Sequence, residues 1–186
     1  MNKFITALCL GAAFLLNPIS SQAQTIGLKV NEIPKGLVIH SVSSNGEKLV
    51  ATYLGQKGRT YDFSVQVSGR KSGNFTAREK YDAQGRMVRW IGNGSYNEKW
   101  IPHYCEFTLG SCVHKHRDQY SRGRTWVYQI ERKGDMLTSL RRLKSESKWR
   151  APKTVTLGPY NIRMKQEITR TDGTKWWRKV TKIVEP

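Results

Sequence analysis

The chain has 186 residues and carries 32 Lys and Arg residues against 14 Asp and Glu residues, which gives a formal net charge of +18. A field this one-sided favours polyanionic partners: nucleic acid, lipopolysaccharide, acidic lipid headgroups or anionic glycans. The chain has no long internal repeat and no low-complexity tract, which excludes a repeat protein.

The first 23 residues have the organisation of a secretory signal peptide. Lys3 supplies a positive start, Phe4–Leu16 is an uncharged apolar run, and Ser21 and Ala23 occupy the small-residue positions before a cleavage site. The run is too short to span a bilayer, which takes roughly 20 apolar residues. We therefore expect a periplasmic or secreted mature chain of residues 24–186 without a membrane-spanning helix; an uncleaved amphipathic anchor is the alternative.

The mature chain is expected to have an extended lead-in at residues 24–36 and a single β domain at residues 37–186. In chain order, β-prone runs are separated by turn signals. These runs are Leu37–Val42, Lys48–Leu54, Tyr61–Val67, Phe75–Tyr81, Arg86–Ile91, Thr125–Ile130, Met136–Leu140, Met164–Arg170 and Lys175–Val184. With the weaker runs between them, about 10–12 strands predict an all-β antiparallel meander in a barrel, half-barrel or sandwich, with at most one short helix.

Two hairpin turns carry the strongest local signal. Asn-Gly at 45–46 and Asp-Gly at 172–173 lie between β-prone runs, and both dipeptides favour a two-residue type I′ turn. In the second hairpin such a turn places Ile168 opposite Trp177, an apolar cross-strand pair. Ser139–Trp149 is open to two interpretations, a short helix or a strand end followed by a charged loop.

Signal cleavage leaves Cys105 and Cys112 as the cysteines of the mature chain. Export to an oxidising compartment predicts a disulfide between them. If these cysteines face each other on a hairpin, His103 lies opposite His114, and His116 shares their face because residues two apart on a strand point the same way.

Three histidines on one face match the ligand count of an open zinc or copper site, so His103, His114 and His116 are candidate metal ligands. The alternative is that they are polar residues on a hairpin pinned by the disulfide. The neighbouring Lys115 and Arg117 disfavour a bound cation electrostatically.

Aromatic and basic residues interleave along the C-terminal half of the chain. Trp176 and Trp177 are adjacent, so on a strand they point to opposite faces, and one of them is exposed or covered by another element. A tryptophan beside arginines is suited to stacking on a base or sugar, or to a lipid headgroup layer. The candidate anion-binding residues are Arg124, Trp126, Arg141, Arg142, Lys148, Trp149, Arg150, Lys175, Trp177, Arg178 and Lys179. The alternatives are burial of the tryptophans and a solvated basic surface that keeps the protein soluble.

Enzymatic chemistry has little support in the sequence. There is no Gly-x-Ser-x-Gly elbow, no His-Glu-x-x-His pair and no phosphate-binding Gly-rich loop. The sequence therefore favours a non-enzymatic binding protein of the cell envelope, without a cofactor, whose ligand is an anionic or amphipathic lipid, lipopolysaccharide or glycan. In its broad outline the expected fold is similar to lipocalin-like barrels and lipoprotein-carrier half-barrels, which implies a ligand on the concave face or rim.

Two alternatives remain open at this point. One is a metal-dependent hydrolase that uses His103, His114 and His116. The other is a protein–protein interaction module, for which the basic charge counts against a basic partner such as lysozyme. We expect no sequence-specific contact with nucleic acid, since an exported protein rarely meets such a target.

Overall fold

The computed structural model describes residues 24–69, 73–94, 99–100, 104–115, 123–170 and 172–186, so the predicted signal peptide lies outside the described residues. Within these residues the strands are β1 (Val38–Ser43), β2 (Lys48–Lys57), β3 (Thr60–Ser68), β4 (Phe75–Tyr81), β5 (Met87–Gly94), β6 (Lys99–Trp100), β7 (Gly110–Lys115), β8 (Thr125–Lys133), β9 (Met136–Leu143), β10 (Lys153–Leu157), β11 (Arg163–Thr169) and β12 (Lys175–Val184). Two short 3-10 turns, η1 (Tyr104–Phe107) and η2 (Pro159–Asn161), complete the described elements. The all-β prediction is confirmed, and each predicted run is a strand.

The open choice at Ser139–Trp149 is settled in favour of a strand end and a charged loop. β9 continues to Leu143, and turns and bends follow it up to β10.

The β1–β2 turn is one residue longer than predicted. The Ser43 N–H donates to the Glu47 carbonyl at 3.0 Å, which leaves three residues in the loop. Of these, Gly46 alone has a positive φ, 82°. A type I′ turn needs positive φ at both central positions, so that prediction is wrong; glycine occupies the single left-handed position of a three-residue loop instead.

The β11–β12 turn departs from the prediction in the same way. The Arg170 N–H donates to the Thr174 carbonyl at 2.8 Å, which again leaves three residues in the loop. The extra residue shifts the pairing by one position, so Ile168 lies opposite Trp176 and not Trp177. The predicted register of this hairpin is therefore wrong.

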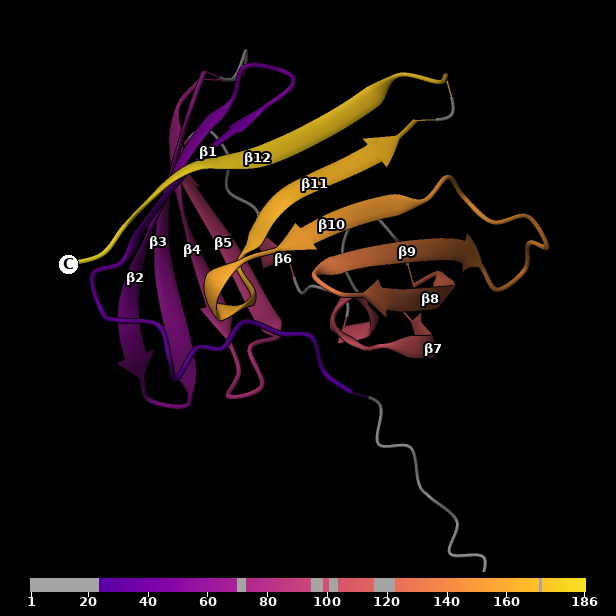
Figure 1. Ribbon diagram of the computed structural model, residues 1–186, viewed down its shortest axis with the longest axis horizontal. Coiled ribbons are helices and arrows are strands. Elements are labelled where there is room, and N and C mark those ends of the chain that lie inside the picture. The colour runs from indigo at the N-terminus through magenta and orange to yellow at the C-terminus, as the bar shows by residue number, and fades with distance from the viewer. Residues whose placement is uncertain (1–23, 70–72, 95–98, 101–103, 116–122, 171) are drawn as a thin grey trace, which may run out of the picture.

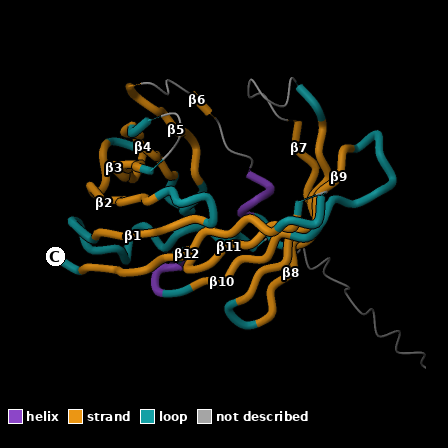
Figure 2. The backbone as a smooth tube through the Cα atoms, turned by 90° about the horizontal axis from the view of Figure 1, so that it is seen from above, coloured by secondary structure: helices purple, strands orange, loops and turns teal. Residues whose placement is uncertain are grey.

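The strands form one antiparallel sheet in the order β6-β5-β4-β3-β2-β1-β12-β11-β10-β9-β8-β7 (Figure 1). Each half of the chain is a meander, and the first and last strands pair in the middle of the sheet, with Val38 opposite Val184. The sheet curves into a trough whose two banks rise on either side of β1, β12, β11 and β10 (Figure 2). In the described chain the edges β6 and β7 do not pair with each other, so the sheet is an open trough and not a closed barrel.

The core lies on the concave face of this trough and includes the predicted lead-in. Val30 and Leu37 are 1% and 0% exposed, and with Ile33 they pack against the apolar face of β2–β5. A smaller cluster in the other half consists of Ile26, Ile130, Leu137, Val155 and Leu157. The segment before β1 is therefore part of the packed structure and bridges both halves.

Candidate functional site

Two short chain segments cross the concave face between the banks of the trough. The Ile26 N–H donates to the Phe107 carbonyl at 2.9 Å, and the Leu109 N–H donates to the Gln24 carbonyl at 3.0 Å. η1 lies between the two banks (Figure 2). We call residues 24–28 and 104–109 together the strap. Because Ile26 lines a cavity on each side of it, the strap divides the interior into a larger and a smaller cavity.

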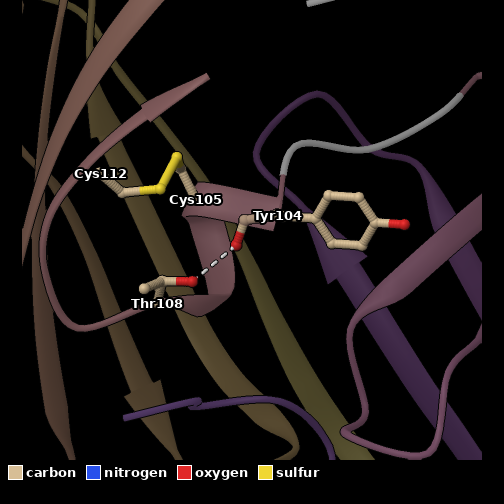
Figure 3. Close-up of a disulfide and its surroundings, with 4 residues drawn as sticks. All are labelled: Tyr104, Cys105, Thr108 and Cys112. Carbon is tan, nitrogen blue, oxygen red and sulfur yellow. Dashed lines mark hydrogen bonds between the residues drawn. A yellow bond between two sulfur atoms is a disulfide. The ribbon is translucent and has the colours of Figure 1, made fainter. Parts of the chain in front are cut away.

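A disulfide between Cys105 and Cys112 attaches the strap to edge strand β7 (Figure 3). The predicted disulfide is thus present, but its expected setting on a hairpin is wrong. Cys105 lies in η1, and the strand partner of Cys112 is Tyr128 on β8. Directly after η1, the Thr108 hydroxyl donates to the carbonyl of Tyr104, the first residue of η1, at 3.1 Å (Figure 3).

The strap is also joined to β10 and β11 by charge. The Glu106 carboxylate lies 3.4 Å from Lys153 Nζ and 3.9 Å from the Arg163 guanidinium. That guanidinium also lies over the Phe107 ring, 4.7 Å from its centroid. Burial lowers the pKa of Lys153, and the nearby Glu106 carboxylate opposes this shift.

The larger cavity, of about 630 Å³, lies against the concave face of β8–β11. Its end near the β8–β9 turn is apolar. Leu137 lies opposite Val155 in the β9–β10 register, and Ile130 is next to them on β8. Ile26 from the strap closes this end, and all four side chains are buried. An apolar chain placed here would contact apolar side chains of β8, β9, β10 and the strap.

The opposite end of the larger cavity is cationic. Arg141 lies four residues beyond Leu137 on the same face of β9, with its guanidinium 5.1 Å from the centroid of the Trp126 ring. Arg150 and Arg170 enter from the loops flanking β10 and β11. Arg150 donates at 2.8 Å to each carboxylate oxygen of Glu146. The cavity therefore runs from a hydrophobic end to an end with three guanidinium groups.

The smaller cavity, of about 200 Å³, lies against the concave face of the N-terminal half and β12. Its walls are mainly apolar, and its polar groups include Glu79, Tyr81 and Arg178. The Tyr81 hydroxyl donates to the Glu79 carboxylate at 2.8 Å. Burial raises the pKa of Glu79, whereas this hydrogen bond and the charges of Arg178 and Arg163 lower it, so the net direction is upward.

This raised pKa predicts a pH-dependent stability. The folded protein binds the Glu79 proton more tightly than the unfolded chain, whose carboxyl has the ordinary value of 4.5. The free energy of unfolding therefore falls as the pH rises from about 4.5 through the folded pKa. Glu79→Gln lacks this equilibrium, so we expect the wild type to lose stability relative to the variant over that interval, measured by urea unfolding across a pH series. Glu131→Gln, which removes an exposed carboxylate, is the charge-matched control; a difference independent of pH would contradict the assignment.

The predicted anion-binding residues are divided between the two faces of the sheet. Trp126, Arg141 and Arg150 line the larger cavity, and Arg178 lines the smaller one. The other predicted residues do not line these two cavities. Arg124 precedes β8, Lys148 and Trp149 are in the β9–β10 loop, and the Arg142 guanidinium lies 5.2 Å from the Trp149 ring centroid. On β12, the opposite face carries Lys175, Trp177 and Lys179.

Sequence reasoning missed three cationic residues of the larger cavity, Lys153, Arg163 and Arg170. None of the three is next to a tryptophan in the sequence, and basic residues interleaved with tryptophan are the pattern that predicts the other anion-binding residues. A signal for Lys153 was present, since Lys153 and Val155 alternate on a short β-prone segment and so share a face. The alternation does not show whether this face is the interior of the sheet; that depends on the strand order.

The histidine hypothesis is not tested by the structure. His114 is on β7, with its ring 6.2 Å from the ring of Tyr104; His103 and His116 lie outside the described residues. Among the residues that are described, no group of three His, Cys, Asp or Glu side chains lies close enough to hold a metal ion. The metal-dependent hydrolase remains a prediction.

Within the described ranges, no helix is long and apolar enough to cross a membrane. Comparisons with family models, curated proteins and solved structures found no match to this chain.

Proposed function

We propose that the protein is an exported, non-enzymatic binding protein that holds an anionic amphiphile with one hydrocarbon chain, such as a fatty acid, in the larger cavity. The observation that carries this proposal is the change from buried apolar side chains at one end of the cavity to three arginines at the other. The signal-peptide pattern of residues 1–23 supports export to the periplasm or the medium.

The cavity has the size and the lining that such a ligand requires. Its volume of about 630 Å³ is in the usual range of small-molecule sites, roughly 300–1,000 Å³. Each methylene group that leaves water contributes about 0.8 kcal/mol to binding. The guanidinium groups of Arg141 and Arg170 match the planar geometry of a carboxylate and form charge-assisted hydrogen bonds with it.

The two acidic side chains of the cavity do not cancel this preference. The Glu106 carboxylate is already in ion pairs with Lys153 and Arg163. The Asp172 carboxylate keeps its negative charge, because hydrogen bonds from the hydroxyl and the backbone N–H of Thr174 lower its pKa. The cationic side chains still outnumber these two carboxylates; they are Arg141, Arg150, Lys153, Arg163 and Arg170. The side chains that face the cavity thus favour recognition of an anion.

The proposal predicts a bound lipid and a specific response to arginine removal. Native mass spectrometry of protein purified without detergent should show co-purified fatty acid. After removal of lipid, cis-parinaric acid fluorescence should report binding that weakens about tenfold in Arg141→Gln/Arg170→Gln, which corresponds to about 1.4 kcal/mol. The methyl ester of the probe should lose affinity for the wild type to a similar degree, because it carries no charge.

Arg59→Gln/Arg89→Gln is the matched control, since it removes two exposed arginines that do not line the cavity. Its affinity for parinarate should stay within about twofold of the wild type. Equal losses in the two double variants would assign the effect to net charge and contradict the cavity site. Failure of the wild type to bind the probe would also overturn the proposal.

A further inference from the structure

The convex face of the central strands carries a row of exposed lysines. On β12, Arg178 and Val180 line the smaller cavity on the concave side. Because adjacent strand residues point to opposite faces, Lys175 and Lys179 project from the convex side together with Trp177. This face is the one turned away from both cavities.

Strand register brings lysines of the neighbouring strands onto the same face. Lys179 lies opposite Lys165 on β11 and opposite Val42 on β1. Val42 in turn lies opposite Lys48 on β2. After the bulge in the β1–β12 pairing, Lys182 lies opposite His40. We call the five exposed residues Lys48, Lys165, Lys175, Lys179 and Lys182 the lysine patch.

The patch has almost no compensating negative charge. β1, β2 and β12 contain no acidic residue, and β11 contributes Glu167, whose carboxylate pairs with Lys165 at 3.0 Å. Like charges placed directly opposite each other, as Lys165 and Lys179 are, destabilise a sheet. An external anionic surface would relieve this repulsion.

The position of the patch suits contact with a flat surface. β1 and β12 are the middle pair of the strand order, so they form the crest of the convex face (Figure 2). Trp177 lies between Lys175 and Lys179 along β12, with Lys179 Nζ 5.6 Å from its ring centroid. Tryptophan favours the headgroup layer of a bilayer, and clustered lysines are attracted to anionic lipid headgroups.

We propose that the lysine patch is a docking surface for an anionic lipid bilayer. Lysine ammonium groups act as point charges and bind phosphate groups without a fixed geometry, as a fluid headgroup layer requires. A single-stranded nucleic acid would call for several aromatic rings on which successive bases stack. Among the described strand residues of this face, Trp177 is the one Trp, Tyr or Phe. Docking in this orientation keeps the cavities on the side away from the bilayer.

Sedimentation with lipid vesicles tests the docking surface. The wild type should bind vesicles of phosphatidylcholine mixed with phosphatidylglycerol, should not bind pure phosphatidylcholine vesicles, and should lose binding as salt increases. Lys48→Gln/Lys179→Gln/Lys182→Gln should weaken binding at least about tenfold. This variant leaves the Lys165–Glu167 ion pair in place.

The control variant is Lys35→Gln/Lys57→Gln/Lys133→Gln, which has the same net charge and removes exposed lysines outside the patch. It should bind the anionic vesicles within about twofold of the wild type. Equal losses in both triple variants, or binding to pure phosphatidylcholine, would overturn the proposal. A patch variant that loses binding to single-stranded DNA while it still binds the anionic vesicles would also overturn it. Parinarate binding by the same variants, with circular dichroism to confirm folding, separates this result from the fate of the cavity proposal.

Discussion

Replacing Gly85 with alanine is expected to lower the free energy of unfolding by about 3–5 kcal/mol. Gly85 closes the β4–β5 turn with a φ of +69°, a conformation that alanine adopts only with strain. A Cβ atom built at this position would overlap the backbone nitrogen and carbonyl oxygen of Leu28 in the strap. The same region holds the hydrogen bond from the Leu28 N–H to the Gly85 carbonyl, 2.9 Å long. The strap would have to move to admit the methyl group.

Gly46→Ala is the control that separates backbone strain from the clash. Gly46 has a φ of +82° and also ends a three-residue turn, but a Cβ there meets nothing within 4 Å. We therefore expect a loss of about 1–2 kcal/mol, measured like that of Gly85→Ala by urea denaturation. If the two substitutions cost the same, the close approach between the strap and the β4–β5 turn does not contribute to stability.

Removing the disulfide is expected to cost about 2–3 kcal/mol, the second large effect. Cys105 and Cys112 are seven positions apart in the sequence, and the bond between them restricts the unfolded chain. In the folded state it also fixes η1 to β7 (Figure 3). Cys105→Ala/Cys112→Ala should thus lower the urea midpoint and also weaken parinarate binding, because the strap forms one wall of the larger cavity.

Thiol reduction of the wild type provides an independent check of this effect. The reduced wild type and the double alanine variant should unfold at similar urea concentrations, since both lack the crosslink. Cys105 is 1% exposed, so a small further loss in the variant is expected from the cavity that the smaller side chain leaves. A double variant as stable as the oxidised wild type would show that the crosslink does not stabilise the fold.

The strands and the positions of the turns could be predicted from the sequence because their signals are local. Tyr61, Phe63, Val65 and Val67 alternate with polar residues, and in β3 the latter three are buried on one face. Asn-Gly and Asp-Gly predict the positions of two turns correctly, but each loop is one residue longer than these dipeptides predict. A two-residue type I′ loop needs a positive φ at the residue before the glycine, whereas the three-residue loop does not. Because Asn and Asp adopt either conformation, the dipeptide alone does not determine the loop length.

Only the tertiary structure decided which basic residues face the cavity and which face the outside. The pairing of Val38 with Val184 joins the two ends of the chain, and no local pattern specifies a contact across that sequence separation. This pairing, together with the strap, determines that Arg141 faces the larger cavity while Lys179 belongs to the convex lysine patch. The sequence by itself determined the alternation of side chains along each strand; the strand order determined which of the two faces became the interior, because curvature and burial are properties of the whole sheet.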